Sequence, residues 1–218
     1  MAEINLLATH PPAKRNYDAR LADKTPAVIR VARQFGREFF DGERKFGYGG
    51  YQYDGRWQAV VECMRRHFNL AEDASILDVG CGKGFLLHDF REAMPGCTIA
   101  GVDVSEYAIK NAMESVKPCL KIGSAETLDF PDNSFDLVVS INSIHNLPLE
   151  PCVRAIKEIQ RVSRQHSYIT IDAWRNEQER ENLMKWILTA ETFMHVDDWI
   201  KLFQEIGYTG DYWWFIAE

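Results

Sequence analysis

The sequence lacks several features that define large classes of proteins. No apolar run reaches the roughly 18 residues that a membrane span needs, and the start of the chain has no apolar core. The five cysteines are odd in number, widely spaced and without a Cys-x-x-Cys pair, which argues against both a disulfide framework and a zinc site. We therefore expect a cytoplasmic protein with free thiols, no signal peptide and no membrane partner.

Positive charge is also scarce. The chain has 25 lysine and arginine residues against 32 aspartate and glutamate residues, which gives a formal net charge of −7. Binding to nucleic acid would need a basic stripe, and the basic stretches of this chain are too short and too mixed to supply one. The acidic residues do not cluster as they would in a magnesium site. We expect neither a nucleic-acid partner nor a metal ion.

From residue 75 onward, short apolar segments alternate with helical patterns. Strands that are apolar throughout and alternate with helices indicate a parallel sheet covered on both faces. The predicted strands span 75–79, 98–104, 119–123, 135–141, 167–173 and 211–217, and the predicted helices about 84–94, 105–115, 150–164, 177–188 and 196–206. The fold class is therefore α/β, a doubly wound, mostly parallel sheet. Any seventh strand should be short and lie at about 189–194.

The N-terminal part is predicted to form an arm, a helical cap and a lid over residues 1–72, ahead of a main domain at 73–218. Residues 1–24 are polar and indicate an arm that is ordered only if something holds it. Thr25 followed by proline starts a helix whose apolar spacing continues to Phe39, and Asp54 opens a second helix.

Between these two helices, the segment FGYGGYQYDGRW combines aromatic residues with glycine. Tyr48, Tyr51 and Tyr53 surround the flexible glycines. A glycine-hinged aromatic loop can close over a cleft and expel water, so this segment is a candidate lid that touches substrate. The alternative is an ordinary loop packed on the domain.

The segment ILDVGCGKGFLL, residues 76–87, places three glycines in five positions between a strand and a helix. Such a turn presents backbone N–H groups at the carboxyl edge of a parallel sheet, where ligands bind. Phe85 stands where the dinucleotide fingerprint needs glycine, and no P-loop follows. Asp103 ends the next strand, 21 residues after Gly82, and can accept both hydroxyls of an adenosine ribose. Together these elements predict a bound nucleoside.

The segments ILDVGCGKG, GVDVSEYAIKNA and AETLDFPDNSFDLVVS resemble class I S-adenosylmethionine-dependent methyltransferases, and most closely the group of the ubiquinone and menaquinone biosynthesis methyltransferases. The resemblance covers roughly residues 73–173 and implies a Rossmann-like methyltransferase fold with S-adenosyl-L-methionine as cofactor. Members of this family usually end in two further strands that form an antiparallel hairpin, whereas this chain shows one convincing strand, 211–217, after the fifth. The cofactor contacts that it implies are Asp78, Gly80, Cys81, Gly82, Gly84, Asp103, Val104, Ser124, Ala125, Glu126, Ser140 and Asn142, although Ser124 stands where the family often has aspartate.

His145 follows the strand at 135–141 and is the candidate catalytic base, because histidine titrates near neutral pH. A structural role is the alternative. Arg175 and His195 join the three lid tyrosines as candidate substrate contacts, with surface exposure and helix capping as their respective alternatives.

The predicted function is methyl transfer to a small-molecule acceptor, such as a sugar or another biosynthetic intermediate. The alternative is a catalytically silent, methyltransferase-like subunit that serves a partner. A homodimer is compatible with both.

Overall fold

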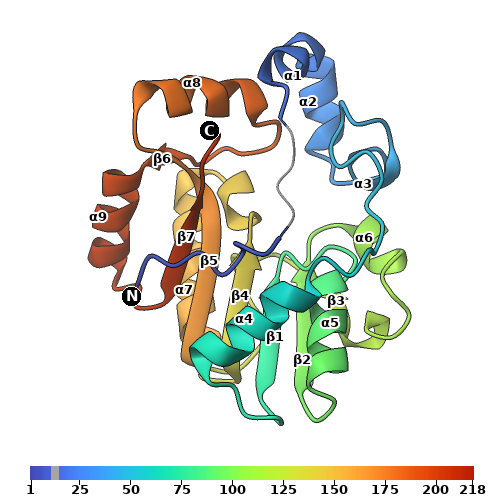
Figure 1. Ribbon diagram of the computed structural model, residues 1–218, viewed down its shortest axis with the longest axis vertical. Coiled ribbons are helices and arrows are strands. Elements are labelled where there is room, and N and C mark those ends of the chain that lie inside the picture. The colour runs from blue at the N-terminus through green and yellow to red at the C-terminus, as the bar shows by residue number, and fades with distance from the viewer. Residues whose placement is uncertain (11–14) are drawn as a thin grey trace.

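The computed structural model of the protein describes residues 1–10 and 15–218. Its centre is a seven-stranded sheet (Figure 1). The strands are β1 (Ser75–Val79), β2 (Thr98–Asp103), β3 (Leu120–Ile122), β4 (Phe135–Ile141), β5 (Ser163–Trp174), β6 (Met194–His195) and β7 (Asp211–Phe215). Their order is β3-β2-β1-β4-β5-β6, with β7 also paired to β5, and each of these pairings is parallel. The predicted α/β fold class is confirmed.

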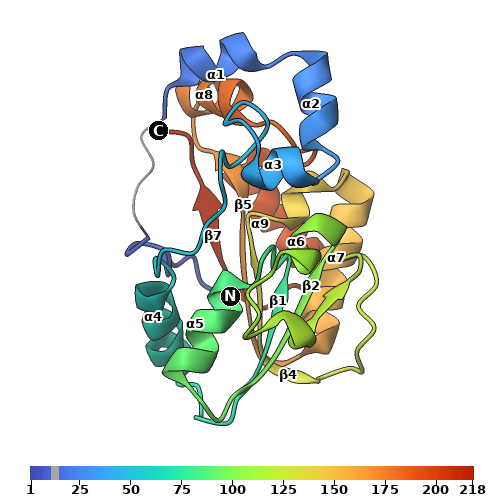
Figure 2. The ribbon, with the colours of Figure 1, turned by 90° about the vertical axis from the view of Figure 1, so that its right-hand side faces the viewer.

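Helices cover both faces of this sheet. They are α1 (Tyr17–Asp23), α2 (Pro26–Ala32), α3 (Arg37–Asp41), α4 (Gln58–Phe68), α5 (Phe85–Ala93), α6 (Glu106–Lys110), α7 (Leu149–Val162), α8 (Glu177–Trp186) and α9 (Val196–Ile206), with 3₁₀ turns η1 (Lys117–Cys119) and η2 (Ile144–Asn146). Neighbouring residues of a strand point to opposite faces. Ile76 of β1 therefore belongs to the core cluster that contains residues of α4 and α5, whereas Leu77 belongs to the cluster with residues of α7 and α9. Figure 2 shows α4 and α5 on one side of the sheet and α7 on the other.

The C-terminal strands differ from the ending that the family resemblance implies. β6 has two residues, which confirms that a seventh strand would be short, and it lies at the end of the predicted range. β7 pairs Asp211 with Tyr168 and Phe215 with Asp172, so it runs parallel to β5. The reason is that α9 carries the chain back across the sheet before β7 begins, and such a crossover makes a parallel pair where a tight hairpin would make an antiparallel one. The described residues contain no antiparallel pair.

The start of the predicted arm is held against the edge of the sheet. The Ile4 N–H donates to the Tyr212 carbonyl at 2.9 Å, and the Tyr212 N–H donates to the Ala2 carbonyl at 3.0 Å. The Tyr168 hydroxyl donates to the Ile4 carbonyl at 3.0 Å, and Leu6 is buried. These contacts cover the outer edge of β7, which would otherwise present unpaired backbone groups. Residues 11–14, in the middle of the predicted arm, lie outside the described residues.

Three helices are shorter than the sequence predicts, and the one expected to open at Asp54 begins at Gln58. The helix capped by Thr25 ends at Ala32, because Phe35 adopts a positive φ of 47° and the chain turns before α3 begins. Helix α6 ends at Lys110 instead of continuing to about residue 115. We call α1 to α3 the cap and residues 43–53 the lid. Figure 2 shows the cap at the same end of the sheet as α6 and α8.

Candidate functional site

A cavity of about 650 Å³ lies at the carboxyl ends of the central strands, beneath the cap and the lid. Its floor includes residues at the ends of β1, β2, β4 and β5, and α8 contributes Trp186 to its far side. Parallel sheets bind ligands at this edge, so the cavity lies where the sequence predicts a nucleoside.

The glycine loop forms the part of the cavity that follows β1. Gly80 has a φ of 85° and Gly82 a φ of 54°, which a residue with a Cβ rarely adopts. A Cβ at position 80 would also collide with the side chain of Ser143. Gly84 has a different task, because a Cβ there would lie 2.7 Å from a methyl group of Val116, on the packed side of α5. Gly80 therefore leaves room for Ser143 and Gly84 for the packing of α5, whereas a Cβ on Gly82 would meet only ordinary contacts from Phe40 and the lid.

Two aspartates stand beside this loop. Asp103 accepts the N–H of Gly82 at 2.7 Å and that of Ser105 at 2.8 Å. Burial raises the pKa of Asp103, and these two hydrogen bonds oppose the rise. Burial, with a further contribution from the charge of Asp103, raises the pKa of Asp78 to about 8. Two neighbouring carboxyl groups with raised pKa values resist ionisation. A cationic ligand beside them would stabilise their charged forms.

The predicted cofactor contacts that follow β2 and β3 line the cavity. Val104 is 62% exposed there, and Ser124, Ala125 and Glu126 lie near it. The Ser124 hydroxyl accepts the Glu126 N–H at 3.2 Å, and the Glu126 carboxylate pairs with Arg154 at 2.7 Å. This leaves an apolar side chain and backbone groups to face a ligand, which suits a flat base.

The two predicted contacts at the end of β4 lie in different places. Ser140 is buried and its hydroxyl donates to the Val79 carbonyl at 2.9 Å, so it joins β4 to β1 beneath the cavity. Asn142 lines the cavity with a positive φ of 50°, and its N–H donates to the Thr170 hydroxyl at 2.9 Å. Cys81 also lines the cavity, where burial raises the pKa of its thiol well above the usual range.

His145 lies in η2, lines the cavity and is 6% exposed. Its Nδ1 accepts the backbone N–H of Asp172 at 3.2 Å, which places the ring proton on Nε2. Burial lowers the pKa of His145, and the nearby Asp172 carboxyl opposes this. His145 is therefore neutral and offers an N–H donor in this arrangement. Acting as a base would require the hydrogen bond to Asp172 to break.

The lid brings aromatic rings to the glycine loop. The rings of Tyr48 and Tyr51 lie 4.4 Å apart, and Tyr51 stacks on Phe85 at 4.7 Å. A Cβ on Gly82 would lie 3.5 Å from the Tyr51 ring, so the lid closes directly over the loop. Tyr53 points elsewhere, since its hydroxyl donates to Asp89 on α5 at 2.5 Å.

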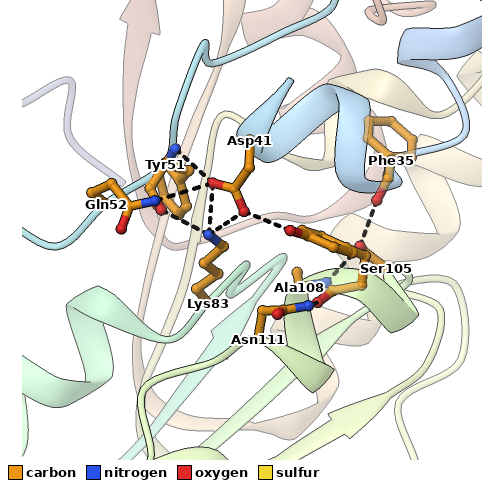
Figure 3. A network of polar contacts seen from close by, with 9 residues as sticks. Phe35, Asp41, Tyr51, Gln52, Lys83, Ser105, Ala108 and Asn111 are labelled. Carbon is orange, nitrogen blue, oxygen red and sulfur yellow. Dashed lines mark hydrogen bonds and ion pairs between the residues drawn. The ribbon is translucent and has the colours of Figure 1, made fainter. Parts of the chain in front are cut away.

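A polar network that sequence reasoning missed ties the cap to the glycine loop (Figure 3). The Lys83 ammonium donates to both carboxylate oxygens of Asp41, at 2.8 and 2.7 Å, and to the Tyr51 carbonyl at 2.9 Å. Asp41 also accepts the Tyr107 hydroxyl at 2.8 Å and the Tyr51 N–H at 3.1 Å. Burial acts to raise the pKa of Asp41, but the hydrogen bonds from Lys83 and Tyr107 outweigh it and lower this pKa. The position of Lys83 inside the glycine motif was the one available signal.

The two predicted C-terminal contacts lie among surface partners. The Arg175 guanidinium pairs with Glu218 at 2.9 Å and with Glu179 at 3.5 Å. His195 caps α9, because its Nδ1 accepts the Asp197 N–H at 3.2 Å. In their place, Arg20 and Arg44 line the cavity beside Trp186. No motif marks these three residues, which are far apart in the sequence.

Comparison with known proteins agrees with this geometry. The family model of the methyltransferase domain matches residues 77–171. The chain is 37% identical over 119 residues to the mitochondrial arginine-hydroxylase NDUFAF5 of Rattus norvegicus, a match that covers 54% of the chain and 32% of the relative. It is 31% identical over 147 residues to tRNA (carboxymethyluridine(34)-5-O)-methyltransferase of Arabidopsis thaliana, with 66% and 34% covered. It is also 31% identical over 139 residues to demethylmenaquinone methyltransferase of Symbiobacterium thermophilum, with 59% and 55% covered.

Solved structures share the fold. The YcgJ protein of Bacillus subtilis has a TM-score of 0.55 at 19% identity, over 67% of this chain and 66% of that one. A putative methyltransferase from Haloferax volcanii, solved with the Trm112 activator, has a TM-score of 0.54 at 19% identity, over 69% and 72%. At these identities the likeness concerns the fold alone.

The sheet and its glycine loop define a Rossmann-like domain built to hold a nucleoside. Residues 77–171, less than half of the chain, match the model of the methyltransferase domain family, in agreement with the resemblance that the sequence shows. The matched segment spans about a third of the length of the first two curated relatives, 32% in each case. Within residues 1–10 and 15–218, no helix has the length and apolar character that a membrane crossing requires.

Proposed function

We propose that this protein transfers the methyl group of S-adenosyl-L-methionine to a small-molecule acceptor. The observation that supports this most is that two buried carboxyl groups lie beside the glycine loop. Gly82 faces the cavity beneath the lid, where a Cβ would meet only ordinary contacts, and Asp78 and Asp103 favour a positively charged ligand. S-adenosylmethionine carries a sulfonium and an ammonium, so its chemistry fits this cradle. When bound, the cofactor supplies an electrophilic methyl group.

The protein's own residues then have three tasks, which are to bind, to exclude water and to orient the acceptor. We assign the first to the glycine loop with Asp78, Asp103 and the residues from Val104 to Glu126 that line the cavity. We assign the exclusion of water to Tyr51, whose ring lies over Gly82, and to Tyr48, whose ring lies 4.4 Å from that of Tyr51. His145 orients the acceptor through its Nε2–H, since its Nδ1 is engaged by the Asp172 N–H.

A small acceptor suits a cavity that the cap and lid cover, whereas a nucleic-acid substrate would need an open basic surface. One relative is named as a tRNA methyltransferase and another as an arginine hydroxylase, so the same domain is found in proteins of different activity. The assignment to a small acceptor therefore rests on the covered cavity and the acidic composition of the chain.

Isothermal titration calorimetry with S-adenosylmethionine and with NAD tests the cofactor. We expect binding of S-adenosylmethionine only, and binding of NAD alone would contradict the proposal. Incubation with methyl-labelled cofactor and fractionated metabolites then separates an enzyme from a silent subunit. A silent subunit would bind the cofactor and label nothing in any fraction.

A further inference from the structure

Three arginine side chains surround one indole ring at the far side of the cavity. The guanidinium carbons of Arg20 and Arg44 each lie 5.5 Å from the centre of the Trp186 ring. That of Arg15 lies 5.8 Å from the same ring and 4.7 Å from the ring of Phe215. Cation–π contacts of this kind hold a guanidinium in place while leaving its edge free to donate hydrogen bonds. Three positive charges thus lie close together around Trp186, although the net charge of the chain is negative.

None of these arginines forms an ion pair among the described residues, although the charge of Arg15 acts on the buried carboxyl of Asp172. Arg20 donates to the carbonyls of Trp186, Arg44 and Lys45, at 3.0 to 3.2 Å, and Arg44 donates to the Gly47 carbonyl. Asp23 acts on Arg20 only as a distant charge, and Asp18 is paired with Lys185. Within the described residues, the Nε of Arg15 is buried without a hydrogen-bond partner. The other arginine that lines the cavity, Arg56, is paired with Asp54 at 2.5 Å.

Neighbouring positive charges in a half-buried site repel one another unless an anion lies between them. Burial lowers the pKa of Arg20, and the charge of Arg44 lowers it further. The site is therefore electrostatically incomplete in the free protein. A carboxylate or a phosphate, which accept paired N–H groups from a guanidinium, would complete it.

The position of this cluster indicates which molecule carries the anion. Asp103 ends β2, and the order β2-β1-β4-β5 puts three strand spacings, roughly 14 Å, between β2 and β5. The arginines lie beyond β5, since Phe215 pairs in register with Asp172 of that strand. His145, which contacts Asp172, lies between the two ends. A ligand at the arginines is thus on the acceptor side of the proposed cofactor site.

We propose that Arg20 and Arg44, supported by Trp186, bind a carboxylate or phosphate group of the methyl acceptor. This inference rests on the proposed function and names its substrate class, a small anionic molecule. The acceptor would extend from His145, near the reacting atom, to the arginines, which fix its other end. The arginines take the place that the sequence suggested for Arg175.

The test uses the full chain saturated with S-adenosylhomocysteine and titrated with benzoate, phenyl phosphate and the neutral benzamide. We expect at least one of the two anions to bind and benzamide to bind at least tenfold more weakly. Arg20→Gln and Arg44→Gln should each lower the affinity for the anion by about tenfold or more. This is the factor that corresponds to the loss of one charge-assisted hydrogen bond. Arg180→Gln is the matched control, because that arginine lies on α8 beside its own partner Glu177. It should leave anion binding unchanged.

The competing source of the anion is the carboxylate of the cofactor itself. Affinities for S-adenosylhomocysteine and for 5′-methylthioadenosine, which lacks the amino-acid tail, distinguish the two. If Arg20→Gln lowers the affinity for S-adenosylhomocysteine and leaves that for 5′-methylthioadenosine unchanged, the arginines bind the cofactor's carboxylate and the inference is wrong. If the wild-type complex binds neither anion, it is also wrong, while the proposed function stands. Failure of S-adenosylhomocysteine to bind at all would instead overturn the proposed function.

Thermal unfolding of each variant shows whether it folds. Should Arg20→Gln prove unstable, Arg20→Lys keeps the charge and loses the planar pair of N–H donors. We expect Arg20→Lys to bind benzoate more weakly than the wild type does. Wild-type affinity in that variant would contradict a site built on guanidinium geometry.

Discussion

Replacing Lys83 by methionine should loosen the cap and lower the stability of the fold. Methionine keeps the apolar stem of the side chain and removes the ammonium that contacts Asp41 and Tyr51. The side chains of Lys83 and Asp41 are 6% and 18% exposed, so the pair lies between the exposed and the fully buried extremes. Exposed pairs contribute about 0–1 kcal/mol, and breaking a buried pair costs about 3–5 kcal/mol. We expect the free energy of unfolding to fall by about 2–3 kcal/mol, because Asp41 keeps its bonds to Tyr107 and to the Tyr51 N–H.

Removal of the acidic partner, Asp41, should lower the free energy of unfolding by more than removal of the Lys83 ammonium does. Asp41→Leu leaves the more deeply buried ammonium with the Tyr51 carbonyl as its remaining acceptor among the described residues, so we expect a loss of about 3–4 kcal/mol. The double variant should be more stable than the sum of the two single changes implies, since each removes the same interaction. Additive losses would mean that the two side chains act independently, which the 2.7 Å contact contradicts.

Urea unfolding followed by circular dichroism measures these differences, and limited proteolysis of the lid at residues 43–53 reports whether the cap opens. Lys117→Met is the control, because Lys117 pairs with an exposed glutamate, Glu114, and its loss should cost less than about 0.5 kcal/mol. The lowered pKa of Asp41 adds a pH signature. Its contribution is fully present above the unfolded pKa of an aspartate, about 4, and is lost as the pH falls through the lower folded value. A Lys83→Met variant as stable as the control, with an equally protected lid, would refute the reasoning.

The remaining predictions concern the cavity. Asp103→Ala should weaken S-adenosylhomocysteine by about 1–3 kcal/mol in calorimetry, because two buried N–H groups lose their acceptor and the ribose loses its own; unchanged affinity would remove Asp103 from the site. His145→Ala should reduce turnover at least tenfold with the cofactor affinity intact, whereas His145→Gln, which keeps an N–H donor, should retain most of the activity. Equal loss in both variants would point to proton acceptance. Affinity for S-adenosylmethionine should rise as the pH passes 8, because Asp78, with a pKa of about 8, then becomes an anion that attracts the cation. Asp78→Asn should remove this rise, and a rise that persists would assign it to another group.

Periodicity and the glycine motif were sufficient to predict the centre of the fold. β4 begins and ends as the sequence predicts, at 135 and 141, because a mostly apolar run rich in β-branched residues and bounded by Ser134 and Asn142 has few alternatives. The break at Phe35 was not predictable, since a positive φ at phenylalanine has no local signal and is imposed by packing. The direction of β7 likewise depends on the crossover through α9, which joins segments that a local pattern treats separately.

In the candidate site as well, residues within local motifs were predictable, whereas residues joined by tertiary contacts were not. Asp78, Gly80, Gly82 and Asp103 lie in two contiguous motifs, and the structure brings them to one cavity. The partnership of Asp41 with Lys83 joins residues 42 positions apart and follows from the docking of the cap.

Where a sequence pattern assigned a residue to the site incorrectly, the reason lies in a tertiary contact. Arg175 follows β5 as ligand residues do, yet its guanidinium pairs with Glu218, and His195 caps the N-terminus of α9. Arg20 and Trp186 meet because α1 packs on α8, and no spacing in the sequence encodes that contact.

The most direct test of the account is transfer of a labelled methyl group from S-adenosylmethionine to a fractionated extract, analysed by the mass of the labelled product. The proposed function predicts label in a low-mass compound with the wild-type protein, and the arginine cluster predicts that this compound is negatively charged. The proposed function also predicts strongly reduced label with Asp103→Ala at a cofactor concentration below saturation. Label confined to RNA or protein, or the same labelled product in equal yield from both proteins, would contradict it.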